Sequence, residues 1–255
     1  MDEFKPDSSL VDRVQVSPNV NERKTGPTDI LILHYTGMDN AEKSLKWLCM
    51  EQSQVSCHYF VFEDGTVVQS VSEGMRAWHA GLSHWRGETD INSKSIGIEI
   101  ANRGHDHGYP EFPEAQVKAV IELSKDICRR NSIPAERVLA HSDIAPLRKS
   151  DPGEKFPWKR LHDEGIGHWV EEEPIEGGTF FQKGDNGEPI EALQSMLVLY
   201  GYGLEITGNY NEETEAVVRA FQRHFRSSKV DGIADLSTIK TLHKLSRALP
   251  VIKTA

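Results

Sequence analysis

The order of hydrophobic and polar positions along the chain predicts a series of short strands. Residues 29–36 form an apolar run bounded by turn residues, which is typical of a buried strand. Two β-rich runs within 57–71 flank Glu63-Asp64-Gly65, and an Asp-Gly pair between such runs predicts a hairpin. Two further strands are predicted, at 95–101 and 137–141.

Helical spacing of apolar residues separates these strands and then replaces them. The first part of the chain has this spacing at 40–54 and at 113–131, where Pro113 suits a helix start. The C-terminal part has it in three segments divided by glycine-bearing turns, at 188–200, 211–226 and 235–248. The two parts of the chain therefore differ in structural class.

These patterns predict two domains joined by a linker. Strands interleaved with helices favour an α/β domain with a mixed central sheet flanked by helices over residues 28–162, preceded by a polar N-terminal extension at 1–27. Residues 163–178 carry an acidic run, a proline and paired glycines, and we interpret them as the linker. Residues 179–249 predict a small all-α three-helix domain.

Composition excludes several classes of protein. The 255 residues carry a net charge of −10 with no Lys/Arg-dense run, which argues against nucleic-acid binding. No apolar run approaches the length of a membrane span, so we expect no membrane insertion. The polar N-terminus does not resemble a Sec-type signal peptide. We interpret Cys49, Cys57 and Cys128 as reduced thiols and leave open whether one pair forms.

Three side chains are candidate metal ligands. His34 and His141 each end a predicted strand, and Asp151 follows ten residues after His141 across a loop. Catalytic zinc takes three protein ligands of this kind and leaves one position for water. Any one of the 11 histidines is more often structural or solvated than a ligand, so spacing alone supports the site only weakly.

Five segments in order give the chain a resemblance to a known family. They are Leu33-His34-Tyr35-Thr36, Ser56-Cys57-His58-Tyr59, Arg76-Ala77-Trp78-His79-Ala80-Gly81, Ser95-Ile96-Gly97-Ile98-Glu99, and His141-Ser142-Asp143-Ile144-Ala145-Pro146 running on to Asp151-Pro152-Gly153. Over about residues 25–160 the chain resembles the type 2 N-acetylmuramoyl-L-alanine amidases, the AmpD-like family. The resemblance implies one Zn2+ per chain, held by His34, His141 and Asp151.

The resemblance also implies roles for other residues. Glu99 would be the acidic catalytic residue, and Lys149 would stabilise the oxyanion. Without the resemblance, Glu99 would be interpreted as part of a surface salt bridge, and either Lys149 or Arg148 could face solvent. The implied substrate-binding residues are Tyr35, His58, Ala77, Trp78, His79 and Asn102. Trp78 could equally belong to the core, and His58 could orient a metal ligand or be a hydrogen-bonded strand histidine.

Two positions depart from the family pattern. Ala140 stands where a glycine usually precedes the second histidine, which we expect to alter only local backbone freedom. Tyr35 stands where cytoplasmic relatives have asparagine, and this favours the branch that acts on the cell wall.

The C-terminal segment resembles the type 1 peptidoglycan-binding domain. This resemblance is based on Gly184-Asp185-Asn186-Gly187, Leu193-Gln194, Leu199-Tyr200-Gly201-Tyr202, Ala220-Phe221-Gln222 and Val230-Asp231-Gly232-Ile233-Ala234. A helical spacer without glycan affinity is the alternative.

Together the two resemblances imply zinc-dependent hydrolysis of the amide bond between N-acetylmuramic acid and L-alanine. The expected substrates are polymeric wall peptidoglycan and soluble (anhydro)muropeptides. The alternatives are a cytoplasmic muropeptide-recycling amidase and a non-catalytic peptidoglycan-recognition protein. We expect a periplasmic or secreted location without a Sec-type signal, with the cytoplasm as the alternative, and a homo-oligomer stays open.

Overall fold

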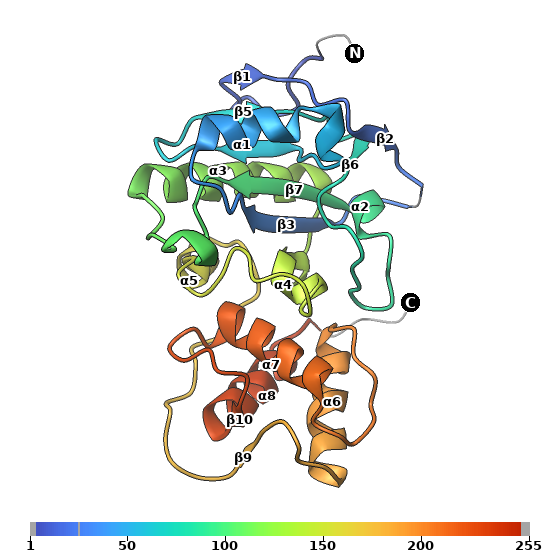
Figure 1. The fold of residues 1–255 in the computed structure, drawn as a ribbon, viewed down its shortest axis with the longest axis vertical. Coiled ribbons are helices and arrows are strands. Elements are labelled where there is room, and N and C mark those ends of the chain that lie inside the picture. The colour runs from blue at the N-terminus through green and yellow to red at the C-terminus, as the bar shows by residue number, and fades with distance from the viewer. Residues whose placement is uncertain (1–3, 25, 251–255) are drawn as a thin grey trace.

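A six-stranded sheet forms the centre of the first unit in the computed structural model, which describes residues 4–24 and 26–250 (Figure 1). Its order is β1 (Arg13–Val14), β5 (Val67–Gln69), β4 (Tyr59–Val61), β7 (Ser95–Ile100), β3 (Ile30–Tyr35) and β8 (Val138–Ala140). β3 pairs in parallel with β7 and β8, and β4 in parallel with β7, whereas β4 and β5 are antiparallel. The predicted mixed sheet and hairpin are confirmed.

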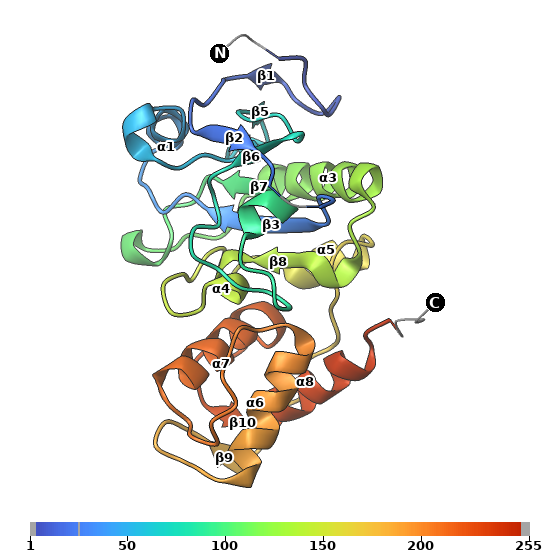
Figure 2. The same cartoon turned by 90° about the vertical axis from the view of Figure 1, so that its right-hand side faces the viewer.

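Helices cover both faces of this sheet, as Figure 2 shows for α1 (Ala41–Leu48) and α3 (Glu114–Asn131). Alternate strand residues point to opposite faces. Phe60 therefore packs in the cluster that contains Leu45 of α1, and Tyr59 in the cluster that contains Val120 of α3. This alternation places every second strand residue on the α1 side.

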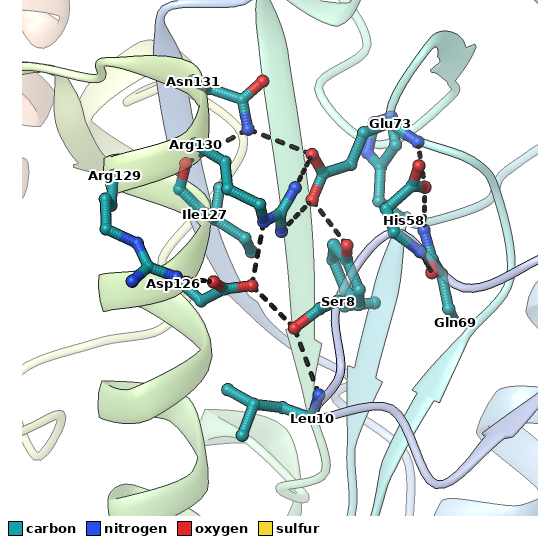
Figure 3. A network of polar contacts seen from close by, with 12 residues as sticks. Ser8, Leu10, His58, Gln69, Glu73, Asp126, Ile127, Arg129, Arg130 and Asn131 are labelled. Carbon is teal, nitrogen blue, oxygen red and sulfur yellow. Dashed lines mark hydrogen bonds and ion pairs between the residues drawn. The ribbon is translucent and has the colours of Figure 1, made fainter.

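The predicted N-terminal extension is part of the first unit where the structure describes it. β1 lies at the sheet edge beside β5, and β2 (Val20–Glu22) pairs with β6 (Met75–Ala77). Asp7 accepts from the backbone N–H of Glu73, and the Ser8 hydroxyl donates to Asp126 on α3 (Figure 3). Strands of two or three residues are too short to show an alternation of apolar and polar residues. The sequence of this segment therefore showed that it is polar but did not predict β1 and β2.

The second unit contains α6 (Glu188–Tyr200), α7 (Glu212–Phe225) and α8 (Leu236–Arg247), which confirms the predicted three helices. The same unit contains a two-stranded antiparallel ribbon, formed by β9 (Phe180–Phe181) and β10 (Ala234–Asp235). Asn211 and Asp235 start α7 and α8 by accepting hydrogen bonds from Thr214 and Thr238, the usual role of an N-cap.

The two units share one hydrophobic core. Trp85 of the first unit is fully buried, and its ring meets those of Tyr200 and Tyr202 edge-on. The first unit also contains three short helices, α2 (Ile91–Lys94), α4 (His141–Ile144) and α5 (Trp158–Asp163), and the first two contribute Ile91 and Ile144 to the same cluster as Trp85. Between α5 and β9 the chain runs along the second unit, where Glu173 accepts from Ser237 on α8. The predicted linker is therefore hydrogen-bonded to the second unit.

The described residues 4–24 and 26–250 bear on two predictions, the one about membrane insertion and the one about the cysteines. No helix there is both long and apolar enough to cross a membrane. Cys49, Cys57 and Cys128 all carry free thiols.

Candidate metal centre and its cavity

Three parallel strands bring the candidate residues to one edge of the sheet. β3, β7 and β8 run in the same direction, so their carboxyl ends meet, and in α/β sheets this edge is where ligands bind. His34 and Glu99 lie near the ends of β3 and β7 and are paired in register, so both side chains project from the same face. His141 begins α4 directly after β8.

The candidate ligand atoms converge. Nδ1 of His34 lies 2.9 Å from Nδ1 of His141, and Oδ2 of Asp151 lies 3.1 Å from the first nitrogen and 3.0 Å from the second. Ligands about 2.0–2.1 Å from a tetrahedral metal are separated by about 3.3 Å, so a small rearrangement would admit an ion. All three side chains are buried, and they form a group that could hold a metal.

Hydrogen bonds leave the facing nitrogen of each histidine free for a metal. Nε2 of His141 lies 3.2 Å from the Ala80 carbonyl and donates to it. Nε2 of His34 lies 3.0 Å from Nδ1 of His79, and Nε2 of His79 lies 3.2 Å from the Ser95 hydroxyl. A neutral His34 that binds a metal through Nδ1 carries its proton on Nε2 and donates it to His79. Such outer partners fix the orientation of metal-binding histidines.

Burial and local charge favour the protonation states that bind metal. Burial lowers the pKa of His34 to about 4, and His141 acts in the same direction, so His34 is neutral at pH 7. Burial alone would raise the pKa of Asp151, but His141 and the hydrogen bonds from both histidines lower it strongly. Neutral imidazole and ionised carboxylate are the metal-binding forms of these side chains.

The centre opens into a cavity of about 440 Å3. Its lining combines His141 and Asp151 of the metal group with polar and aromatic side chains, among them Tyr35, Trp47, Trp78, His79, Glu99, Arg148 and Lys149. One carboxylate oxygen of Glu99 is buried and has no hydrogen-bond partner in the described part of the chain. Burial raises the pKa of Glu99 well above its usual value, and the Asp151 charge adds to this, while Lys149 opposes it. Glu99 is therefore available to a ligand.

Arg148 and Lys149 differ in their contacts. The Arg148 guanidinium donates to the carbonyls of Ala80 and Leu82 at 2.6 Å each, so it holds the loop that follows His79. Lys149 is half-buried and lines the cavity, and among the described residues its ammonium group has neither a hydrogen bond nor an ion pair. Of the two cations, Lys149 is the one available to a ligand.

The structure separates the six predicted substrate-binding residues into two groups. Tyr35, Trp78 and His79 line the cavity, with the Tyr35 hydroxyl 3.0 Å from Ser150. His58, Ala77 and Asn102 do not line it. His58 is fully buried and accepts from the Gly97 N–H at 3.0 Å, and burial with the Arg23 charge lowers its pKa to about 3.

The other two residues outside the cavity also make internal contacts. Ala77 is fully buried in β6. Asn102 donates to the Pro110 carbonyl and accepts from the Gly104 N–H, so it holds a loop. The structure thus gives all three residues internal contacts.

Sequence reasoning missed several residues of the site. Trp47 lines the cavity from α1 and is 44% exposed. Its helical position was readable, but nothing in the sequence placed α1 at the cavity. Asn92 accepts from the backbone N–H groups of His79 and Ala80 and so fixes the metal-facing loop. Gly97 lies beneath the His79 ring.

Comparison with protein families divides the chain into two matched regions. Residues 24–154 match the family described as N-acetylmuramoyl-L-alanine amidase. Residues 186–242 match the family described as putative peptidoglycan binding domain.

One relative matches most of the chain, and another matches less than half of it. It is 39% identical over 223 residues to N-acetylmuramoyl-L-alanine amidase AmiD of Escherichia coli K12, covering 82% of this chain and 79% of that protein. It is 39% identical over 108 residues to 1,6-anhydro-N-acetylmuramyl-L-alanine amidase AmpD of Enterobacter cloacae, covering 42% and 56%.

Solved structures resemble both units together. The complex of E. coli AmiD with anhydro-N-acetylmuramic acid-L-Ala-D-gamma-Glu-L-Lys has a TM-score of 0.73 at 36% identity, covering 91% of this chain and 90% of that one. AmpDh3 of Pseudomonas aeruginosa in complex with anhydromuramic pentapeptide also has a TM-score of 0.73, at 30% identity, covering 93% and 99%.

Proposed function

We propose, from the premise that this chain belongs to the N-acetylmuramoyl-L-alanine amidase family, that it hydrolyses the bond between N-acetylmuramic acid and L-alanine with one Zn2+. The observation that carries the proposal is the meeting of His34, His141 and Asp151 at a cavity that His141, Asp151 and Glu99 line together. A recognition protein that does not cut its ligand would not need this combination.

The donor set suits zinc. Two imidazole nitrogens and one carboxylate oxygen are ligands that catalytic zinc sites use, and three such ligands leave one position open. A bound Zn2+ would supply Lewis-acid polarisation of the substrate carbonyl and lower the pKa of water. His79 and the Ala80 carbonyl would hold the two histidines in the correct orientation.

Glu99 is the proposed proton carrier. Its free carboxylate oxygen can accept the proton of the attacking water and return it to the alanine nitrogen that leaves. A pKa raised by burial suits both steps, because the group must accept a proton and then release it.

Lys149 is the proposed stabiliser of negative charge on the carbonyl oxygen. Lys149 lines the cavity, and its charge lowers the pKa of Glu99. A cation in a partly buried site is worth more to a developing charge than the same cation in water. The contacts of Arg148 with two carbonyls make it a support for the loop instead.

The proposed substrates are wall peptidoglycan and soluble muropeptides. Two similar enzymes have been solved with anhydromuramyl peptides bound, which supports the soluble class. The match to a peptidoglycan-binding family supports the polymer, because holding one part of a polymer raises the local concentration of its other cleavage sites. We therefore place the enzyme at the wall, in the periplasm or outside the cell, with cytoplasmic recycling as the alternative.

Digestion of intact sacculi and of purified muropeptides, with and without a zinc chelator, tests the proposal by mass spectrometry. Release of stem peptides beginning with L-alanine from both substrates, lost with the chelator and restored by Zn2+, is the expected result. Undiminished release after complete zinc removal would refute the metal mechanism. Cleavage of muropeptides alone would favour recycling, and fractionation of the producing cells would then find the enzyme in the cytoplasm.

A further inference from the structure

Asp143 is a fully buried carboxylate at the boundary between the two units. Its Oδ2 accepts from the Ala140 N–H at 2.8 Å and from Nδ1 of His224 at 2.6 Å. Its Oδ1 accepts from the Tyr202 hydroxyl at 2.8 Å. Two of its three partners therefore come from the C-terminal unit, although Asp143 stands two residues after a candidate metal ligand.

The two C-terminal partners are held rigidly. The His224 ring is stacked between Trp158, at 3.7 Å between ring centroids, and Phe225, at 3.8 Å. Tyr202 is buried, and its ring meets Trp85 edge-on at 5.1 Å. Neither donor can turn away from Asp143 without opening the shared core.

Asp143 in turn holds the turn that carries His141. The Asp143 carboxylate accepts a hydrogen bond from the N–H of Ala140, the residue before α4, and so caps the start of this helix. α4 has only four residues and begins at His141. The Ser142 N–H of the same helix donates to the Asp151 carbonyl at 3.0 Å. A shift of α4 would therefore move His141 and the backbone of Asp151 together.

We propose that the C-terminal unit is a structural part of the metal centre, with Tyr202 and His224 as positioning residues that act on His141 through Asp143. This inference rests on the proposed zinc amidase and adds a second task to a unit that its family match connects with peptidoglycan. Removing one donor leaves a buried carboxylate short of a partner, and α4 must then rearrange to satisfy it.

Tyr202→Phe in the full-length protein, with Tyr210→Phe as its matched control, tests the inference. Both changes delete one buried hydroxyl of the same unit, but the Tyr210 hydroxyl donates to the Gly232 carbonyl and not to Asp143. Zinc affinity is measured by competition with a chromophoric chelator, alongside the melting temperature of the metal-free protein. We expect Tyr202→Phe to weaken zinc binding by up to about tenfold, the low end of the loss for a direct partner of a ligand, because Tyr202 acts through Asp143. Tyr210→Phe should lower the melting temperature about as much as Tyr202→Phe does, but it should leave zinc affinity unchanged.

A second pair of variants separates positioning from general stability. His224→Asn keeps a donor near the place of Nδ1, whereas His224→Leu keeps apolar bulk and removes the donor. Zinc affinity and kcat on soluble muropeptide should fall in His224→Leu and recover substantially in His224→Asn, with KM changed little. Equal zinc affinity in wild type, Tyr202→Phe and His224→Leu would overturn the inference. A wild-type protein that binds no zinc would instead refute the proposed function.

Discussion

The imidazole of His79 lies so close to Gly97 that a methyl group at Gly97 would come within 2.5 Å of Nδ1 of His79. That nitrogen is the one that faces His34. A residue without a side chain on β7 thus permits the contact that orients a metal ligand on β3.

Gly97→Ala should weaken metal binding by displacing His79. The backbone of β7 is fixed by strands on both sides, so the His79 ring must move and its contact with His34 is lost. Loss of such a partner typically costs ten- to hundredfold in metal affinity. Zinc affinity is measured by competition with a chromophoric chelator. Gly177→Ala is the control, because a methyl group there meets nothing within 4 Å. Wild-type affinity in Gly97→Ala would contradict the role given to His79.

Glu99→Gln should abolish most of the activity while leaving the metal bound. Glutamine keeps the shape of Glu99 but cannot accept the proton of water, and general acid–base catalysis contributes about 10²–10⁴-fold to rates. The measurements are kcat on soluble muropeptide and zinc content per chain. A kcat within a few-fold of wild type would assign the proton transfer to another group.

Glu73→Gln should destabilise the protein at neutral pH and much less in acid. Burial alone would raise the pKa of Glu73, but hydrogen bonds from Arg130, Tyr59 and Asn131 lower it below its usual value (Figure 3). A lowered folded-state pKa means that ionised Glu73 stabilises the fold above the unfolded pKa of about 4.3, and that this is lost as the pH falls through the folded value.

Urea unfolding of this variant at pH 7 and at pH 3 measures the effect. The loss at pH 7 should be about 1.5–3 kcal/mol, the range for hydrogen bonds to a charged group, and should shrink at pH 3. Glu63→Gln, which changes an exposed glutamate, is the control. An equal loss at both pH values would show that the charge of Glu73 is not what stabilises the fold.

Trp85→Ala should destabilise both units, because Trp85 packs in the core that the two units share and contacts Tyr202 of the second. Truncation of a buried tryptophan to alanine typically costs about 3–5 kcal/mol. Calorimetry should show one unfolding transition in the wild type and a lower or divided transition in the variant. Trp47→Ala, at an exposed position, should change the melting temperature little. Two separate transitions in the wild type would mean that the units unfold independently.

Local pattern predicted most of the regular structure. The strand that contains His34 and the hairpin turn at Asp64-Gly65 appear where the sequence placed them, because strand burial and turn geometry depend on neighbouring residues. The described part of the N-terminal extension was assigned no strand, since β1 and β2 are held by edge pairing with segments more than 50 residues away.

The sequence by itself determined the two structural classes along the chain, the segments that match the amidase family and the identity of the candidate ligands. Residue types and their spacing carry that information. Only the tertiary structure decided that His79 orients His34, that His58 is an internal residue, and that Asp143 is held by His224 across 81 positions. These contacts depend on which surfaces pack together, and packing of distant segments leaves no periodic trace in the sequence.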